Sequence, residues 1–247
     1  MRYFLEIAYK GTNYHGWQLQ NNANSVQEEI NKAITTVLGT PVNITGSGRT
    51  DTGVHASQQW AHVDLMKLNQ NEFKFKLNSI LPTDICIKSV HLVNKSAHAR
   101  YDATKRTYRY FLHTQKNPFL QETSYFFPRV IDVSSVAESC NLIKEWKDFK
   151  SFSRVKTEVK HFECDINDIN WTENNKGIHV FEISSDRFLR GMVRSLVGTL
   201  LEVGLGRLSM KELHRILKAK DRRMAGRSVP AHGLFLDSVI YPSYIFE

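Results

Sequence analysis

The sequence GSGRTDTGVHA occupies residues 46–56 and is the most distinctive stretch of the chain. Three of its first eight residues are glycines, which allow a tight turn and let another segment of backbone approach closely. Strand-like segments flank it at residues 42–45 and 57–65. The sequence therefore predicts a short loop between two strands that presents Arg49 and Asp51.

Residue chemistry alone leaves the role of this loop open. A phosphate-binding loop requires GxxxxGK[ST] and a dinucleotide site requires GxGxxG, and neither spacing is present in this segment. Asp51 and His55 would give a metal only two ligands, and no clustered carboxylates support them. An Asp that only caps its own turn is the ordinary alternative in a Gly-rich loop.

Helices and strands alternate on both sides of this segment, which predicts an α+β fold. Residues 2–10 alternate as a strand does, and Ser25 and Glu28 open a helix that Gly39 ends. Ser135 with Glu138 also predicts a helix start. Further expected elements are helices at 71–80, 188–204 and after 209, and strands at 86–93, 107–113, 163–171, 178–184 and 234–241. The order of elements in residues 1–105 resembles that in 106–247, which suggests two halves.

Composition favours a folded chain with an anionic partner. The 247 residues are 41% hydrophobic, and 33 Lys and Arg against 25 Asp and Glu give a net charge of +8. A positive balance suits nucleic acid, because Lys and Arg release the counterions condensed on phosphates. The three cysteines, Cys86, Cys140 and Cys164, are too scattered for a zinc site or a disulfide framework. With neither a signal peptide nor an apolar span in the sequence, we expect a soluble, cytoplasmic protein without membrane contact.

Several segments, in order, resemble the TruA family of tRNA pseudouridine synthases. GRTDTGVHA at residues 48–56 resembles the signature of the family. GWQLQ at 16–20, AHARYDATKRTYRY at 97–110, FLRGMVRSLVGTLLEVG at 188–204 and HGLFLDSVIYP at 232–242 resemble other segments of it. The resemblance spans nearly the whole chain.

The resemblance implies a role for four residues. Asp51 stands at the position of the catalytic Asp, and pseudouridine formation rearranges only atoms of the substrate, so no cofactor and no metal are expected. Arg49 would help bring the uridine out of its stack, and Tyr108 would stack on the target base. Arg194 would lie beside Asp51 and keep the carboxylate ionised.

The resemblance also implies where RNA binds. The expected substrate is the anticodon stem-loop of tRNA, with target uridines at roughly positions 38, 39 and 40. Basic residues expected to contact it are Arg100, Lys105, Arg106, Arg109 and Arg154, with weaker candidates at Lys150, Lys156, Lys160, Arg222, Arg223 and Arg227. Leu19, Arg190 and Gly191 depart from the pattern of the family, which puts some substrate contacts in doubt but leaves the reaction unaffected.

The implied fold has two pseudo-symmetric halves that resemble ferredoxin-like or RRM-like units. Their strands are expected to form one continuous, mixed, mainly antiparallel sheet with helices outside and a basic cleft at the centre, and the protein is expected to be a homodimer. Two alternative functions remain, that of a non-catalytic RNA-binding module and that of a metal-dependent nuclease. The first gives no reason for Asp51 in its motif, and the second predicts strand cleavage that chelators inhibit.

Overall fold

The computed structural model describes residues 1–154, 159–174 and 176–246, and the chain forms two compact units. The first unit comprises Met1–Arg106 together with Phe235–Glu247, and the second comprises Thr107–Leu234. The predicted halves divided the chain once, near residue 105. In the structure the last strand returns to the first unit, because its residues pair in parallel with β3.

The first unit is built on a mainly antiparallel sheet. Its elements are β1 (Arg2–Tyr9), α1 (Val26–Leu38), β2 (Thr45–Gly46), β3 (His55–Asp64), α2 (Gln70–Ile80), β4 (Ile85–Val93) and β9 (Leu234–Ile240). β1 pairs with β4 and β3, and β2 pairs with β3, all antiparallel. The βαββαβ order with β1 at the centre is the ferredoxin-like arrangement expected from the sequence.

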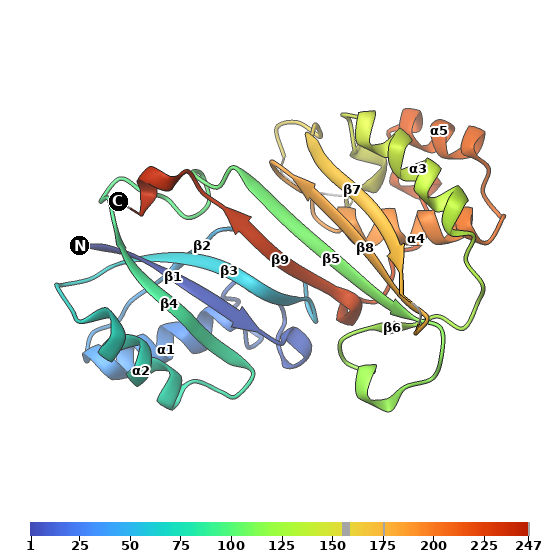
Figure 1. Ribbon diagram of the computed structural model, residues 1–247. Helices are drawn as coiled ribbons and strands as arrows, with labels where there is room; N and C mark the ends of the chain where they lie inside the picture. Colours follow the sequence, from blue (N-terminus) through green and yellow to red (C-terminus); the bar gives the residue numbers. More distant parts are fainter. Residues whose placement is uncertain (155–158, 175, 247) are drawn as a thin grey trace. The chain divides into compact units, whose positions relative to one another are not determined.

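The helices of the first unit form where their end signals predict. Ser25 accepts a hydrogen bond from the Glu28 amide, and Gly39 adopts the left-handed conformation that ends α1. Asn69 caps α2 in the same way. Figure 1 shows both helices on one face of the sheet, where Ile30, Ile34 and Leu77 are fully buried.

The second unit repeats the order of strand, helix, two strands and helix. Its elements are β5 (Lys105–His113), β6 (Tyr125–Phe126), α3 (Val133–Glu145), β7 (Ile166–Glu173), β8 (Ile178–Ser185), α4 (Met192–Gly204) and α5 (Met210–Ala219). β8 lies between β5 and β7, as β3 lies between β1 and β2 in the first unit. The three helices pack together beside β7 and β8 (Figure 1). The α+β class is thus confirmed in each unit.

Short single-turn helices complete the described chain. They are η1 (Gly11–Asn13), η2 (Pro118–Leu120), η3 (Lys150–Phe152), η4 (Arg222–Met224), η5 (Ala231–Gly233) and η6 (Ser243–Ile245). Within the described ranges, no helix has the length and apolar character needed to cross a membrane.

One predicted helix start was wrong. The Ser135 and Glu138 pair does not open α3, because Asp132 takes the cap position and accepts hydrogen bonds from the amides of Ser134 and Ser135. The helix therefore starts one turn earlier than predicted, and the Asp132 carboxylate lies at the positive end of the helix dipole, where a negative charge is stabilising. The helix expected after residue 209 is confirmed as α5, which a capping box of Ser209 and Glu212 opens with both reciprocal hydrogen bonds present.

A buried histidine makes the stability of the first unit depend on pH. His62 of β3 is 7% exposed, and its Nδ1 accepts a hydrogen bond of 3.2 Å from the Ala99 amide. Burial lowers the pKa of His62 to about 4, and the positive charges of Arg2 and His98 act in the same direction. The unfolded chain therefore binds a proton more tightly than the native state does, so stability falls as pH drops from about 6.5 to about 4.

We predict that His62→Asn removes part of this pH dependence. Asn retains a short side-chain acceptor for the Ala99 amide but does not titrate. Urea unfolding at pH 7 and pH 4.5 should show the wild type losing about 2 kcal/mol more than the variant on acidification. Equal losses in the two proteins would contradict the assignment of this effect to His62.

Candidate active site

Asp51 stands at the start of a tight turn that the rest of the first unit holds in place. The Asp51 carbonyl accepts a hydrogen bond of 3.1 Å from the Val54 amide, and Gly53 has a φ of +75°. A positive φ at the third position of such a turn favours glycine. The Asp51 side chain is half-buried, and Arg49 two residues earlier is exposed.

Thr50, the residue directly before Asp51, is fixed on both its side chain and its backbone. Its buried hydroxyl lies 2.8 Å from the Tyr9 hydroxyl at the end of β1, and its carbonyl accepts a hydrogen bond of 3.3 Å from the Trp17 amide. The Trp17 ring packs against Tyr9 with 5.9 Å between ring centroids. The loop that precedes α1 thus forms a wall against the turn that carries Asp51.

Two glycines, Gly16 in this loop and Gly46 in β2, let the loop and the segment that leads to Asp51 pack closely together. Gly16 has a φ of +93°, and a Cβ placed on it would lie 2.4 Å from the Thr50 carbonyl oxygen. A Cβ on Gly46 would lie 2.4 Å from the Trp17 indole nitrogen. Side chains at these positions would therefore displace either the turn or the wall. The sequence motif GWQLQ carries no signal of this bracing role of Gly16 and Trp17, which only the structure shows.

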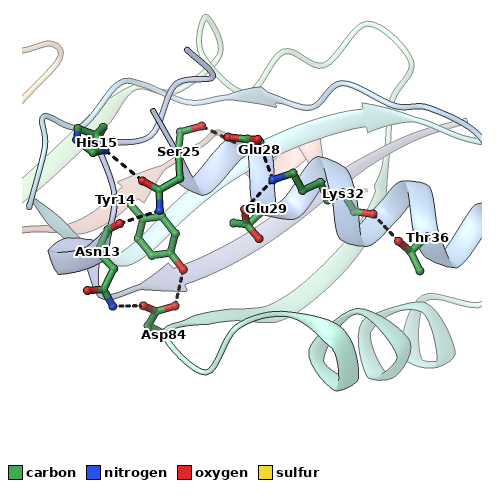
Figure 2. A network of polar contacts seen from close by, with 10 residues as sticks. Asn13, Tyr14, His15, Ser25, Glu28, Glu29, Lys32, Thr36 and Asp84 are labelled. Carbon is green, nitrogen blue, oxygen red and sulfur yellow. Dashed lines mark hydrogen bonds and ion pairs between the residues drawn. The ribbon is translucent and has the colours of Figure 1, made fainter. Parts of the chain in front are cut away.

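The far end of the same loop is fastened by polar contacts shown in Figure 2. The Tyr14 hydroxyl donates to an Asp84 carboxylate oxygen at 2.5 Å, and the Asn13 amide nitrogen donates to the other oxygen at 3.0 Å. Burial raises the pKa of Tyr14, and the Asp84 hydrogen bond raises it further, so the hydroxyl stays protonated as the donor. The Tyr14 carbonyl then accepts from the Gly53 amide at 3.3 Å, which ties this network to the Asp51 turn.

The entry to the turn, residues 46–48, is held from β3. The Ser47 hydroxyl pairs with the Gln59 side-chain oxygen, and the Gln59 amide nitrogen donates to the Gly48 carbonyl at 3.0 Å. His55, at the exit, is fully buried, and its Nδ1 accepts from the Gly11 amide at 2.9 Å. Among the described residues, no group of three or more His, Cys, Asp or Glu is placed to hold a metal ion.

One of the predicted RNA contacts in the first unit, Arg106, has a structural use. The Arg106 guanidinium donates to three carbonyls, those of Ala103 at 3.3 Å, Arg100 at 2.7 Å and Ser47 at 3.2 Å. Arg106 therefore links two segments of the protein. Arg100 is exposed, and Lys105 is half-buried at the start of β5.

The second unit holds the other predicted residues. Tyr108 is half-buried and packs edge-on against Phe188, with 5.0 Å between ring centroids. Arg109 pairs with Glu182 across neighbouring strands at 2.6 Å. Arg154 is exposed, and its amide donates to the Arg190 carbonyl at 2.9 Å, which places it at the turn that leads into α4. The weaker candidate Lys156 lies outside the described residues.

Arg194 is half-buried in the first turn of α4 and is oriented by a strap of backbone, residues 225–230. Its Nε donates to the Val229 carbonyl at 2.7 Å, and its own carbonyl accepts from the Val229 amide at 3.1 Å. The strap lies against the helix because Gly198 has no side chain, since a Cβ there would meet the Arg227 carbonyl oxygen. Backbone contacts with Val229 therefore tie Arg194 to the strap at both its main chain and its guanidinium.

We predict that Gly16→Ala destabilises the protein far more than Gly39→Ala. Both glycines have a positive φ, so both variants lose about 1 kcal/mol from backbone strain. A Cβ on Gly39 meets nothing within 4 Å, whereas one on Gly16 overlaps the Thr50 carbonyl. Urea unfolding should place Gly16→Ala about 2 kcal/mol or more below Gly39→Ala. Equal stability of the two variants would show that the close approach at Gly16 carries no energetic weight.

Comparison with known proteins now relates this arrangement to a family. The profile of a family described as tRNA pseudouridine synthase matches residues 7–102 and 146–242, which include the Asp51 turn and α4. A solved chain titled as a Cbf5-Nop10-Gar1 complex aligns with a TM-score of 0.33 and 12% identity over 80% of this chain and 54% of that chain, which is too weak to support an argument.

Curated relatives match over the whole length. The tRNA pseudouridine synthase A of Parabacteroides distasonis is 45% identical, with 99% of this chain and 98% of the relative covered. The protein of the same name from Bacteroides fragilis is 45% identical, with 100% of this chain and 98% of the relative covered. The one from Bacillus subtilis is 37% identical, with 98% of this chain and 99% of the relative covered. The resemblance noted in the sequence is confirmed, and the chain belongs to the tRNA pseudouridine synthase family.

Proposed function

We propose that this protein isomerises uridine to pseudouridine in tRNA and that Asp51 is its catalytic carboxylate. The observation that carries the assignment is the placement of Asp51, half-buried on a turn whose flanking residues are fixed from three sides. A preorganised carboxylate is what nucleophilic or base catalysis requires, because correct positioning contributes much of the rate.

The reaction breaks the N1–C1′ bond of uridine, turns the uracil, and forms a C5–C1′ bond. The proton on C5 is lost to solvent and N1 gains one, so the atoms balance without an oxidant or a second substrate. The Asp51 carboxylate would act as a nucleophile at C1′ or at C6, or as a base toward C2′. All three routes need the uridine out of its stack, which costs a few kcal/mol.

The exposed Arg49 side chain, two residues before Asp51, suits the proposed role in extruding the uridine. A planar guanidinium can fill the vacated space or hold phosphates. Tyr108 would stack on the base, and Arg194 would hold the Asp51 carboxylate in its charged form. The proposed substrate is the anticodon stem-loop, with uridines at about positions 38 to 40, and the proposed acting form is a cytoplasmic homodimer.

We predict that Asp51→Asn and Asp51→Ala abolish turnover, by at least about a thousandfold, while tRNA affinity changes little. The measurement is release of tritium from C5-labelled uridine in tRNA, with affinity from filter binding. Asp168→Asn, an exposed carboxylate on β7, is the matched control and should retain activity. Near-normal tritium release from Asp51→Ala would overturn the assignment.

The same assay separates the proposed activity from its rivals. Tritium release should occur without added metal and persist with a chelator, because the chemistry uses only the carboxylate and the substrate. Chain cleavage that a chelator stops would indicate a nuclease. Binding of tRNA with no tritium release from the wild type would indicate a non-catalytic RNA-binding protein.

The role of Arg194 is tested separately. We predict that Arg194→Met lowers kcat by about tenfold or more and leaves the KM for tRNA within about threefold, because the charge acts on the Asp51 carboxylate and not on the RNA. Arg207→Met removes a charge of the same sign just beyond the opposite end of α4, where Arg207 pairs with Glu202, and should leave kcat unchanged. A raised KM with normal kcat would assign Arg194 to RNA binding instead.

A further inference from the structure

An aromatic ring stands exposed on the turn formed by residues 97–102, between β4 and β5. The Tyr101 side chain is 73% exposed. One side of the ring rests on His98, with 4.3 Å between ring centroids and an interplanar angle of 35°. The Arg100 guanidinium lies 5.6 Å from the centroid of the Tyr101 ring, at cation–π distance.

Hydrogen bonds fix the backbone of the turn that carries this ring. The Ala97 carbonyl accepts from Arg2 at 2.9 Å, the Ala99 amide donates to His62, and the Ala99 carbonyl accepts from Tyr241. The amides of Arg100 and Tyr101 both donate to the His98 ring nitrogen Nδ1, at 3.1 and 3.4 Å. The backbone that carries Tyr101 is therefore fixed, so little backbone entropy is left to lose when a ligand binds.

The turn lies next to the entry of the Asp51 loop within the same unit. One nitrogen of Arg106, Nη2, donates both to the Arg100 carbonyl at 2.7 Å and to the Ser47 carbonyl at 3.2 Å. The two carbonyls are thus neighbours, and Ser47 lies four residues before Asp51. An RNA strand whose target nucleotide reaches Asp51 would pass close to this turn.

We propose that Tyr101 and Arg100 form a stacking platform for an unpaired base of the RNA, next to the nucleotide that reacts at Asp51. The inference rests on the proposed function. A base stacks on an aromatic face whatever its identity, and the guanidinium adds attraction to the base or its phosphate. Such a platform binds neighbouring nucleotides without reading their sequence.

Another exposed ring of the first unit lacks these features. Phe75 of α2 is 72% exposed, close to the value for Tyr101. It lies on a helix surface, and no cation–π partner is found for it within the described residues. Single exposed apolar side chains of this kind are ordinary on protein surfaces. Phe75 is therefore a control for the loss of an exposed ring.

The test uses full-length protein and an anticodon stem-loop RNA that carries 2-aminopurine at one loop position at a time. Stacking on the platform should quench the fluorescence at one position in the wild type and in Tyr101→Phe. Tyr101→Leu keeps apolar packing on His98 but has no ring, so it should lose the quench and bind about tenfold more weakly at fixed salt. Phe75→Ala should match the wild type in both.

Steady-state tritium release separates the platform from a structural role. A platform that binds substrate and transition state equally predicts a KM raised about tenfold in Tyr101→Leu with kcat within about twofold of the wild type. A fall in kcat with unchanged KM would show that Tyr101 acts through the Asp51 turn, and would overturn the inference. Thermal unfolding of Tyr101→Leu and Tyr101→Phe verifies that both fold.

The inference and the proposed function fail in different ways. A wild type that neither binds tRNA nor releases tritium would overturn the function itself. A different result is that the wild type binds tRNA and releases tritium while Tyr101→Leu shows the same fluorescence quench and the same affinity as Phe75→Ala. That result would overturn only the platform.

Discussion

The close contact between the loop before α1 and the turn that carries Asp51 is the constraint on which the proposed site depends. The Trp17 amide and the Tyr9 hydroxyl fix Thr50 from two directions, and Gly16 leaves room for the Thr50 carbonyl. A carboxylate that must meet one atom of an extruded nucleotide has to be held within a fraction of an ångström. In the proposed mechanism, the bracing residues supply that precision.

In the same unit, one basic residue that the sequence predicts to bind RNA has a structural task. Arg106 is a basic residue in a basic segment, yet its guanidinium donates to three backbone carbonyls of the protein. The hydrogen bonds to the Ala103 and Ser47 carbonyls are partly buried, so losing them would cost at most about 1–3 kcal/mol each. Arg106 therefore has a structural task within the protein, beside the RNA contact proposed for it.

In the second unit, the first turn of α4 is organised by backbone contacts. The strap at residues 225–230 passes over the helix where Gly198 has no side chain, and Val229 bonds Arg194 through both its amide and its carbonyl. The free thiols of Cys140 and Cys164 are buried in this unit, and burial raises their pKa to about 12. Both thiols therefore stay protonated and serve as packing groups.

Much of the fold was predictable from local signals, because caps and periodicity act over a few residues. The helix that starts after Ser25 and ends at Gly39, and the capping box at Ser209, are examples. The prediction failed at α3, where Asp132 caps the helix three residues before Ser135. Asp132 and Ser135 are both residue types that commonly cap helices, so the sequence alone does not choose between them. The path of the chain that enters the helix makes the choice.

The sequence by itself determined the family and the residue proposed for catalysis, because GRTDTGVHA and the ordered segments around it are specific enough to recognise. Only the tertiary structure decided what holds Asp51 in place and which basic side chains form hydrogen bonds within the protein. Those answers depend on contacts between residues far apart in the chain, such as Gly16 with Thr50 and Arg106 with Ser47. Such contacts leave no periodic signal, since they arise only when the folded backbone brings distant segments together.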